Sequence, residues 1–354
     1  MKKILKDLSM LRGIPGQEKE VRDYMKEAMA PYAESVETDN LGSVIAKKTG
    51  KKDGPRIMVA GHMDEVGFMV KKITDEGYVK FIPAGGWWSQ VMLAQQMEIT
   101  TSKGDRIRGV IGAKAPHILT EEERKKPMKM DDMYLDLGVD DKEEAEKLGI
   151  RTGDMITPFI ESVELSNKKY LLGKAWDNRV GCAAAIDTLK AFENKDHPNV
   201  YYGVGTVQEE VGLRGAGTSA YHVNPDIGIA VDTTIAYDFP GGDKETKLGE
   251  GVAIMIADSS MVGHKGMRDF VINACEENDI PYQLTSLKRG GTDGGKIHLS
   301  RSGVPTVALA LPVRYLHSHT SIVHEGDYEN LLKLLEVLVS TLDKDAVEKI
   351  TYGA

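Results

Sequence analysis

The stretch NRVGCAAAIDTLKAFENKDHPNVYYGVGTVQEE, residues 178–210, decides the fold class. Its first half, 178–193, is rich in small apolar residues and is typical of a packed helix. Its last part, 200–210, is interpreted as a buried strand because it opens with a largely apolar run that ends at Val207. Strands without polar alternation belong to sheets that are covered on both faces. This stretch therefore predicts an α/β layer.

The alternation of helix and strand continues to the end of the chain. Further strands are expected at 226–235 and 303–316, and further helices at 268–278 and 326–345. Before the deciding stretch, Val21, Met25 and Met29 recur at four-residue steps and predict a helix within 17–32. Strands are expected to follow it at 43–47 and from Arg56. We therefore expect one α/β domain, formed by 1–70 and 163–354.

Residues 71–162 have a different pattern, which predicts a separate β-rich domain. Its expected strands, broken by Gly, Asp and Ser, lie at 78–86, 95–112 and 133–139. A charged run at 120–132 is interpreted as a solvated loop or surface helix. Because α/β segments flank this part on both sides, we interpret it as an insertion into the α/β domain.

Composition excludes some function classes. The chain has 354 residues, 41% hydrophobic and 28% charged, with a formal net charge of −9. Proteins that bind nucleic acids or anionic membranes usually carry clusters of Lys and Arg. Because this sequence has no basic tract, neither partner is expected. An apolar run long enough for a transmembrane helix is not found. With two cysteines and without a recognisable signal peptide, the chain is expected to be cytoplasmic.

Side chains that can bind metal ions follow the predicted strands. They are His62 with Asp64 two residues later, the pair Glu209 and Glu210, Asp232, His317, and Asp177 just before a helix. Ligands of open α/β sheets bind beyond the carboxyl ends of the strands, so these side chains could converge there. Taken alone, each of these side chains could have an ordinary structural role instead of binding a metal ion. Asp177, for example, could be a helix N-cap. For the site to be absent, all of these alternatives would have to hold together.

Two histidines and three carboxylates form a nitrogen and oxygen donor set suited to Zn²⁺, Co²⁺ or Mn²⁺. Five ligands exceed what one catalytic zinc requires, but they suit two ions if one carboxylate bridges them. The remaining carboxylate of the Glu209–Glu210 pair could then act as a general base. Asp64 is a natural partner for orienting the His62 ring. His317 is preferred over His319 because it comes first after the strand.

Six motifs, in this order, resemble the TET-type (tetrahedral-assembly) metallo-aminopeptidases. The motifs are GHMDEVGF, AWDNRVG, VQEEVGLRGA, AVDTT, GGTDGG and RYLHS. That family includes glutamyl, leucyl and deblocking aminopeptidases, and some of its members are labelled endoglucanases. The resemblance covers nearly the whole chain. It implies a zinc-peptidase-like catalytic domain, with a mixed sheet between helices, and an inserted β-barrel-like dimerisation domain.

The resemblance also implies roles for single residues. Asp177 would bridge two divalent ions, His62 and Asp232 would complete one site, and Glu210 and His317 would complete the other. Glu209 would be the general base and Asp64 would support His62. Peptides would be the substrates. Dimers formed through the inserted domain would assemble into a dodecamer.

The residues leave other functions open. A deacylase, dipeptidase or carboxypeptidase could use the same donor set, and the endoglucanase label suggests glycoside hydrolysis, which needs two carboxylates and no metal. A non-catalytic scaffold would not need a spare glutamate beside the ligands. Candidate pocket residues are His264, Arg289 and Asp293. A preference for acidic substrates would need a cationic pocket, for which Arg289, Lys244 and Lys265 are candidates by composition.

Overall fold

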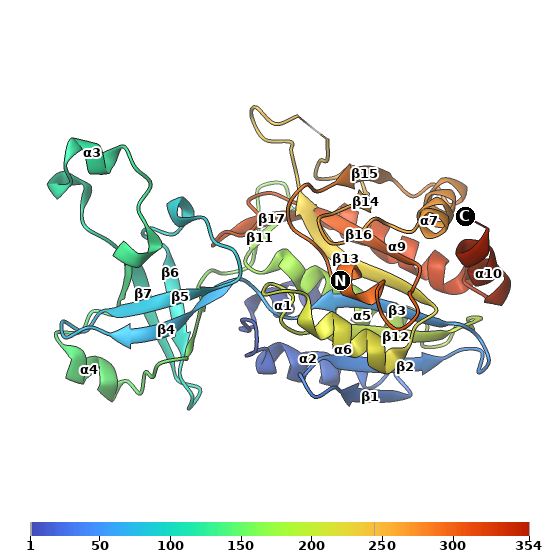
Figure 1. Ribbon diagram of the computed structural model, residues 1–354, viewed down its shortest axis with the longest axis horizontal. Helices are drawn as coiled ribbons and strands as arrows, with labels where there is room; N and C mark the ends of the chain where they lie inside the picture. The colour runs from blue at the N-terminus through green and yellow to red at the C-terminus, as the bar shows by residue number, and fades with distance from the viewer. Residues whose placement is uncertain (1, 244, 354) are drawn as a thin grey trace.

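The computed structural model describes residues 2–243 and 245–353 and shows two units joined side by side (Figure 1). The larger unit is built on an eight-stranded sheet, and the smaller one is a closed barrel. The order in the sheet is β1 (Ser35–Thr38), β2 (Val44–Thr49), β12 (Val200–Thr206), β3 (Arg56–His62), β13 (Ile227–Ile235), β16 (Thr306–Val313), β14 (Val252–Ala257) and β15 (Tyr282–Ser286).

The sheet is mixed, as expected. Its four central strands, β12, β3, β13 and β16, run parallel, whereas β2 is antiparallel to β12 and β14 is antiparallel to β16. Because the central strands are parallel, their carboxyl ends all lie at one edge of the sheet. That edge is where the predicted ligands follow the strands.

Helices cover both faces of the sheet. On one face lie α1 (Lys2–Met10), α2 (Lys19–Met29), α5 (Trp176–Ala191), α7 (Lys265–Glu277), α9 (Glu325–Thr341) and α10 (Lys344–Tyr352). The other face carries α6 (Arg214–Val223) and α8 (Gly294–Ile297). In β3, Ile57 and Val59 join the first hydrophobic cluster, while Met58 and Ala60 join the second. This division explains why the strand has no polar alternation.

The smaller unit is a closed barrel of β4 (Gly67–Ile73), β5 (Val79–Ala84), β8 (Tyr134–Asp136), β7 (Arg106–Gly112), β6 (Gln96–Thr100) and β9 (Met155–Pro158). Its interior is filled by its own cluster of apolar side chains around Phe68 and Ile99. The barrel begins at Gly67, four residues before the boundary expected at residue 71. The apolar run continues through Phe68 without turn residues, so the sequence does not mark where one unit gives way to the other.

The charged run at 120–132 contains the short helix α3 (Glu121–Arg124), which lies on a projecting loop of the barrel (Figure 1). Short helices η1 (Ser89–Val91), η2 (Pro116–Ile118), η3 (Met130–Asp132) and α4 (Lys142–Lys147) complete this unit. A three-stranded sheet of β10 (Val163–Glu164), β11 (Tyr170–Gly173) and β17 (Ser321–His324) follows the barrel. Among the helices of the described residues, none has both the length and the apolar character needed to cross a membrane.

Candidate active site

The predicted ligands meet at the carboxyl edge of the parallel strands. His62 is the last residue of β3 and Asp232 lies within β13. Glu209 and Glu210 follow β12, which ends at Thr206 rather than at residue 210 as expected, because Gln208 has a φ of 56° and turns the chain. His317 follows β16.

Asp177 occupies the centre of the cluster. Its Oδ1 lies 3.1 Å from Nε2 of His62, and its Oδ2 lies 3.3 Å from Nε2 of His317. It lies within helix α5 but has non-helical dihedral angles, and its side chain is turned to the two imidazoles instead of capping the helix. The N-cap alternative for Asp177 therefore does not describe this structure.

Two groups of ligand atoms share the Asp177 carboxylate. His62, Asp177 and Asp232 form one group, and Asp177, Glu210 and His317 form the other, with the atoms of each group within 4.8 Å of one another. Oδ1 of Asp232 lies 3.8 Å from Nε2 of His62, and Oε1 of Glu210 lies 3.5 Å from Nε2 of His317. This arrangement suits two neighbouring cations bridged by one carboxylate.

The electrostatics of the cluster also fit a cation. Burial raises the pKa of Glu210 to about 7, and it raises the pKa values of Glu209 and Asp232 well above their usual range. Burial alone would lower the pKa of His62, but Glu209 and Asp177 outweigh it and raise the pKa. Within the described part of the chain, Oε1 of Glu210 is buried without a hydrogen-bond donor. Divalent cations would stabilise these carboxylates in their charged form.

Backbone carbonyls orient both imidazoles. Nδ1 of His62 lies 3.0 Å from the carbonyl oxygen of Asp64, and Nδ1 of His317 lies 3.0 Å from that of Gly86 in the barrel unit. Such contacts leave Nε2 free to bind a metal ion. His319 is engaged elsewhere, because its Nε2 lies 2.8 Å from the carbonyl oxygen of Gln96. The structure therefore brings His317, and not His319, to the cluster.

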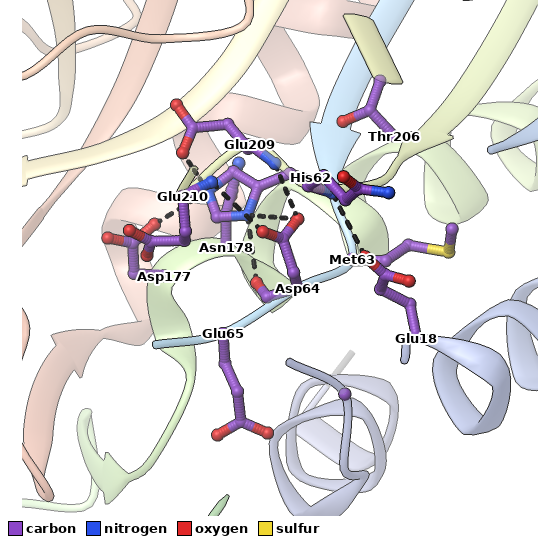
Figure 2. A network of polar contacts seen from close by, with 12 residues as sticks. Glu18, His62, Met63, Asp64, Glu65, Asp177, Asn178, Thr206, Glu209 and Glu210 are labelled. Atoms are coloured by element: carbon purple, nitrogen blue, oxygen red, sulfur yellow. Dashed lines mark hydrogen bonds and ion pairs between the residues drawn. The ribbon is translucent and has the colours of Figure 1, made fainter. Parts of the chain in front are cut away.

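Asp64 differs in detail from the expected partner of His62. Its carboxylate oxygen lies 3.6 Å from Nδ1 of His62, beyond hydrogen-bond distance. The two carboxylate oxygens instead accept hydrogen bonds from the backbone N–H groups of Glu209 and Glu210, each at 3.1 Å (Figure 2). Asp64 thus holds the loop that carries the general-base candidate, and its carbonyl orients the imidazole.

A cavity of about 1080 Å³ opens above the cluster. Its walls include Arg289 and apolar side chains such as Leu213, Ile235 and Phe239. Asp293 lies deeper, buried and hydrogen-bonded by the hydroxyl of Thr206.

Other candidate pocket residues lie away from the cavity. His264 caps α7 by accepting a hydrogen bond from the N–H of Met267, and it lines a separate hollow with His298. Lys265 pairs with Asp269 on the surface of α7. Lys244 lies outside the described residues.

Sequence reasoning missed a buried ion cluster beneath the site. Glu65 is paired with Lys174 and with Arg179, whose guanidinium also donates to the carbonyls of Met63 and Leu8. All three charged side chains are almost fully buried. Arg179 and Glu65 do stand within the motifs AWDNRVG and GHMDEVGF, but motif membership alone does not distinguish a supporting charge from a ligand.

The fold and the site together define a class of protein, the metal-dependent hydrolases with two neighbouring ligand groups at the edge of an α/β sheet. Sequence comparison identifies the family: the profile of the M42 glutamyl aminopeptidases matches residues 42–334. The chain belongs to this M42 family and is a metal-dependent aminopeptidase.

Individual relatives agree over nearly their full lengths. A glutamyl aminopeptidase of Lactococcus lactis is 36% identical, and the alignment covers 98% of each chain. The crystal structure of a TET aminopeptidase from a marine sediment thaumarchaeon is 42% identical, with a TM-score of 0.96 and 99% of each chain covered. A dodecameric structure, PhTET1-12s, is 31% identical in sequence to this chain and has a TM-score of 0.86. The match covers 97% of this chain and 99% of that one.

Proposed function

We propose that this aminopeptidase is dinuclear and removes residues from the N-termini of peptides. His62 and Asp232 would hold one ion, Glu210 and His317 would hold the other, and Asp177 would bridge them. The observation that carries this proposal is that both ligand groups share the Asp177 carboxylate, whose two oxygens face different imidazoles. A single ion would leave one of the two groups without a function.

The chain's own residues would provide binding and proton transfer. Zinc, cobalt or manganese, all compatible with this donor set, would supply Lewis acidity and lower the pKa of a water molecule. Glu209 lines the cavity, and its Oε2 lies 3.8 Å from Nε2 of His62. Glu209 would take the proton from the attacking water and deliver it to the amine that leaves when the peptide bond breaks.

Substrate selection would rest on the cavity walls. Apolar side chains such as Leu213 and Phe239 and one guanidinium, Arg289, would surround the first residue of the peptide. A preference for acidic residues is compatible with Arg289 and with the name of the Lactococcus relative. Glycoside hydrolysis is disfavoured because a metal-free glycosidase has no use for two imidazoles among its carboxylates.

We also propose a functional division between the units and a cellular location. The sheet unit would carry catalysis, and the inserted barrel unit, which begins at Gly67, would mediate dimer formation. Dimers would assemble into a dodecamer, as the name of one related structure describes for that protein. Two free, buried cysteines, Cys182 and Cys275, suit the reducing cytoplasm.

Hydrolysis of a panel of aminoacyl-anilides tests the proposal. The protein is stripped of metal with a chelator, and zinc or cobalt is then titrated back while bound metal is measured by mass spectrometry. We expect activity to disappear on stripping and to return in full only when two ions are bound per subunit. Substrates with a free α-amine should be cleaved and N-acetylated ones should not.

Other outcomes would redirect the assignment. Full activity with one ion per subunit would refute the dinuclear site. Cleavage of N-acetylated substrates would favour a deacylase, and cleavage from the C-terminus of peptides would favour a carboxypeptidase. Hydrolysis of cellulose that survives chelation would favour the glycosidase alternative.

A further inference from the structure

Two buried carboxylates hold the backbone of the loop that carries Glu209 and Glu210. Asp64 accepts from the N–H groups of these two glutamates. Oε1 of Glu18 accepts from the N–H group of Gln208, the residue directly before them, at 3.2 Å. Three consecutive backbone donors, 208–210, are thus hydrogen-bonded by side chains from distant parts of the sequence. Figure 2 shows Glu18 and Asp64 beside this loop.

Glu18 is unusual at its own position. It is the N-cap residue of α2, where a side chain ordinarily accepts from the first turn, but in the described structure it makes no such bond. Its Oε1 accepts instead from the N–H group of Gly16, at 2.6 Å, and from Gln208. The residue is only 2% exposed. Burial of a carboxylate is unfavourable, and capping of α2 does not explain it here.

The backbone at Gln208 requires support. Its φ of 56° lies in the left-handed region, which costs roughly 1–2 kcal/mol for a residue with a side chain. This turn sets the direction in which the chain leaves β12. It therefore sets the backbone positions from which the side chains of Glu209 and Glu210 extend. A contact that fixes the Gln208 amide also fixes the backbone of both functional glutamates.

The Glu18 segment is itself anchored. The side-chain amide of Gln17 donates to the carbonyl of Gly153 in the barrel unit at 2.9 Å. The carbonyl of Gly13 accepts from the N–H of Glu65 at 2.8 Å, next to Asp64. Glu18 therefore reaches the loop from a segment that is hydrogen-bonded both to the barrel unit and to the residue next to Asp64.

We propose that Glu18 is a positioning residue for the catalytic loop, which aligns Glu209 and Glu210 through the Gln208 amide without touching substrate or metal ion. The inference rests on the roles proposed above for these two glutamates. In this role Glu18 acts as a hydrogen-bond acceptor, and its side-chain length determines whether it can contact the loop. A glutamine, whose amide oxygen can accept the same two bonds, should therefore replace it, and an aspartate, one carbon shorter, should not.

The test compares Glu18→Ala, Glu18→Asp and Glu18→Gln with the wild type. Glu20→Ala is the matched control, because Glu20 lies in α2 and pairs with Arg106 and Arg12, away from the loop. Loss of an outer partner of a metal site typically costs 10–100-fold in activity or affinity. We expect kcat to fall about 10–100-fold in the alanine and aspartate variants, with KM within about threefold of the wild type. Glu18→Gln and Glu20→Ala should keep at least half of kcat.

Two readouts do not depend on turnover. Cobalt titration into stripped protein should show an affinity about 10–100-fold weaker for one of the two ions in Glu18→Ala, since Glu210 is misaligned. Hydrogen exchange of the Gln208 amide, measured on metal-free protein, should be at least about tenfold faster in that variant but not in Glu18→Gln, because an acceptor has been lost. If the alanine variant does not fold, Glu18→Asp provides the same comparison.

Each remaining outcome decides against the inference or against its basis. Wild-type kcat, metal affinity and amide exchange in Glu18→Ala would overturn it. Equal losses in Glu18→Gln and Glu18→Ala would also overturn it, because the charge and not the acceptor would then matter. If the wild type itself cleaved no free-amine substrate, the proposed function would fail, whereas the exchange data would still decide whether Glu18 holds the loop.

Discussion

Glu209 and Glu210 are neighbours in the sequence and yet face different partners. Oε2 of Glu209 lies 3.8 Å from Nε2 of His62, whereas Oε1 of Glu210 lies 3.5 Å from Nε2 of His317. The turn at Gln208 and the hydrogen bonds from both backbone N–H groups to the Asp64 carboxylate allow the two consecutive side chains to diverge. The same pair can therefore provide a base and a ligand.

Replacement of Glu209 by glutamine should separate these two tasks. Glu209→Gln keeps the shape of the side chain but removes the proton acceptor, so kcat should fall about 10²–10⁴-fold. Metal content, measured by mass spectrometry, should stay at the wild-type value because the proposed ligands are unchanged. Glu250→Gln, an exposed glutamate, is the control. Retained turnover in Glu209→Gln would remove this residue from its proposed role.

The candidate ligands could be named from the sequence because each follows an apolar strand or opens a helix. The sequence could not show the details that orient them. The carbonyl of Gly86 that contacts His317 comes from the inserted unit, 231 positions away in the chain. Glu18 resembles an ordinary first-turn glutamate until its backbone partner, Gln208, is seen. Because almost any residue type can provide a backbone N–H or carbonyl group, such contacts cannot be recognised from the sequence.

Lys174 should give the stability a characteristic pH dependence. Burial lowers its pKa to about 8, although Glu65 opposes the shift. An unfolded lysine keeps its proton up to about pH 10.4, so between about pH 8 and 10.4 the unfolded state binds more protons. Stability contributed by this group is therefore lost as the pH falls through 8 and regained toward 10.4, with a slope of at most about 1.4 kcal/mol per pH unit.

Denaturant unfolding of the wild type and of Lys174→Met, measured between pH 7.5 and 9.5, tests this dependence. Methionine retains the apolar stem without the titrating group, and Arg179 remains as a partner for Glu65. The stability of the wild type relative to the variant should rise with pH across this range. A difference that stays constant, or that falls as the pH rises, would contradict the shift.

At the scale of elements, the contact between β3 and α5 positions the centre of the site. Gly61 lies directly before His62, and Gly181 lies one turn beyond Asp177. A Cβ atom built on Gly61 would lie only 2.4 Å from the backbone carbon of Gly181. The two elements can approach so closely because Gly61 lacks a side chain. This close approach brings the His62 ring to the Asp177 carboxylate.

Gly61→Ala should therefore separate the strand and the helix. We expect a loss of stability of about 1–3 kcal/mol, typical of an overpacked core, together with weaker metal binding. Gly217→Ala on α6 is the matched control, because the nearest atom to its Cβ would lie 4.0 Å away. The control should be neutral or stabilising, since alanine favours a helix over glycine. Equal melting temperatures for Gly61→Ala and the wild type would contradict the packing argument.

Strong apolar patterns made the central elements predictable, and weak ones hid the rest. The strands β12, β13 and β16 and the helices α5, α7 and α9 fall within or close to the expected ranges. Helix α6 was not expected, because its sequence RGAGTSAYHV is rich in glycine and small polar residues that do not favour helix by themselves. Packing of Ala216 and Ala220 against the sheet stabilises it instead.

At the scale of the whole molecule, the barrel unit takes part in building the site. Arg12 in the sheet unit pairs with Glu98 in the barrel, with 2.8 Å between Nε and Oε1. The loop after β16 contacts barrel carbonyls twice, through His317 to Gly86 and through His319 to Gln96. Deletion of the barrel should therefore have two separable effects, one on assembly and one on metal binding.

Replacement of residues 67–158 by a short Gly-Ser linker tests both effects. Light scattering should detect smaller particles than the wild type forms, because the proposed dimer contact is removed. Cobalt titration should show a weaker site as well, because Nδ1 of His317 loses the Gly86 carbonyl that orients it. Replacement of 118–126 alone, which includes α3 on its projecting loop, is the control and should leave metal affinity unchanged.

The two effects need not occur together, and their combination is informative. Native particle size after deletion of the barrel would show that the insertion does not mediate assembly. Native metal affinity would show that the Gly86 contact is dispensable for His317. Loss of size with retained affinity would leave the barrel with assembly alone. Loss of both, with normal affinity in the 118–126 control, would show that the inserted unit serves both assembly and the metal site.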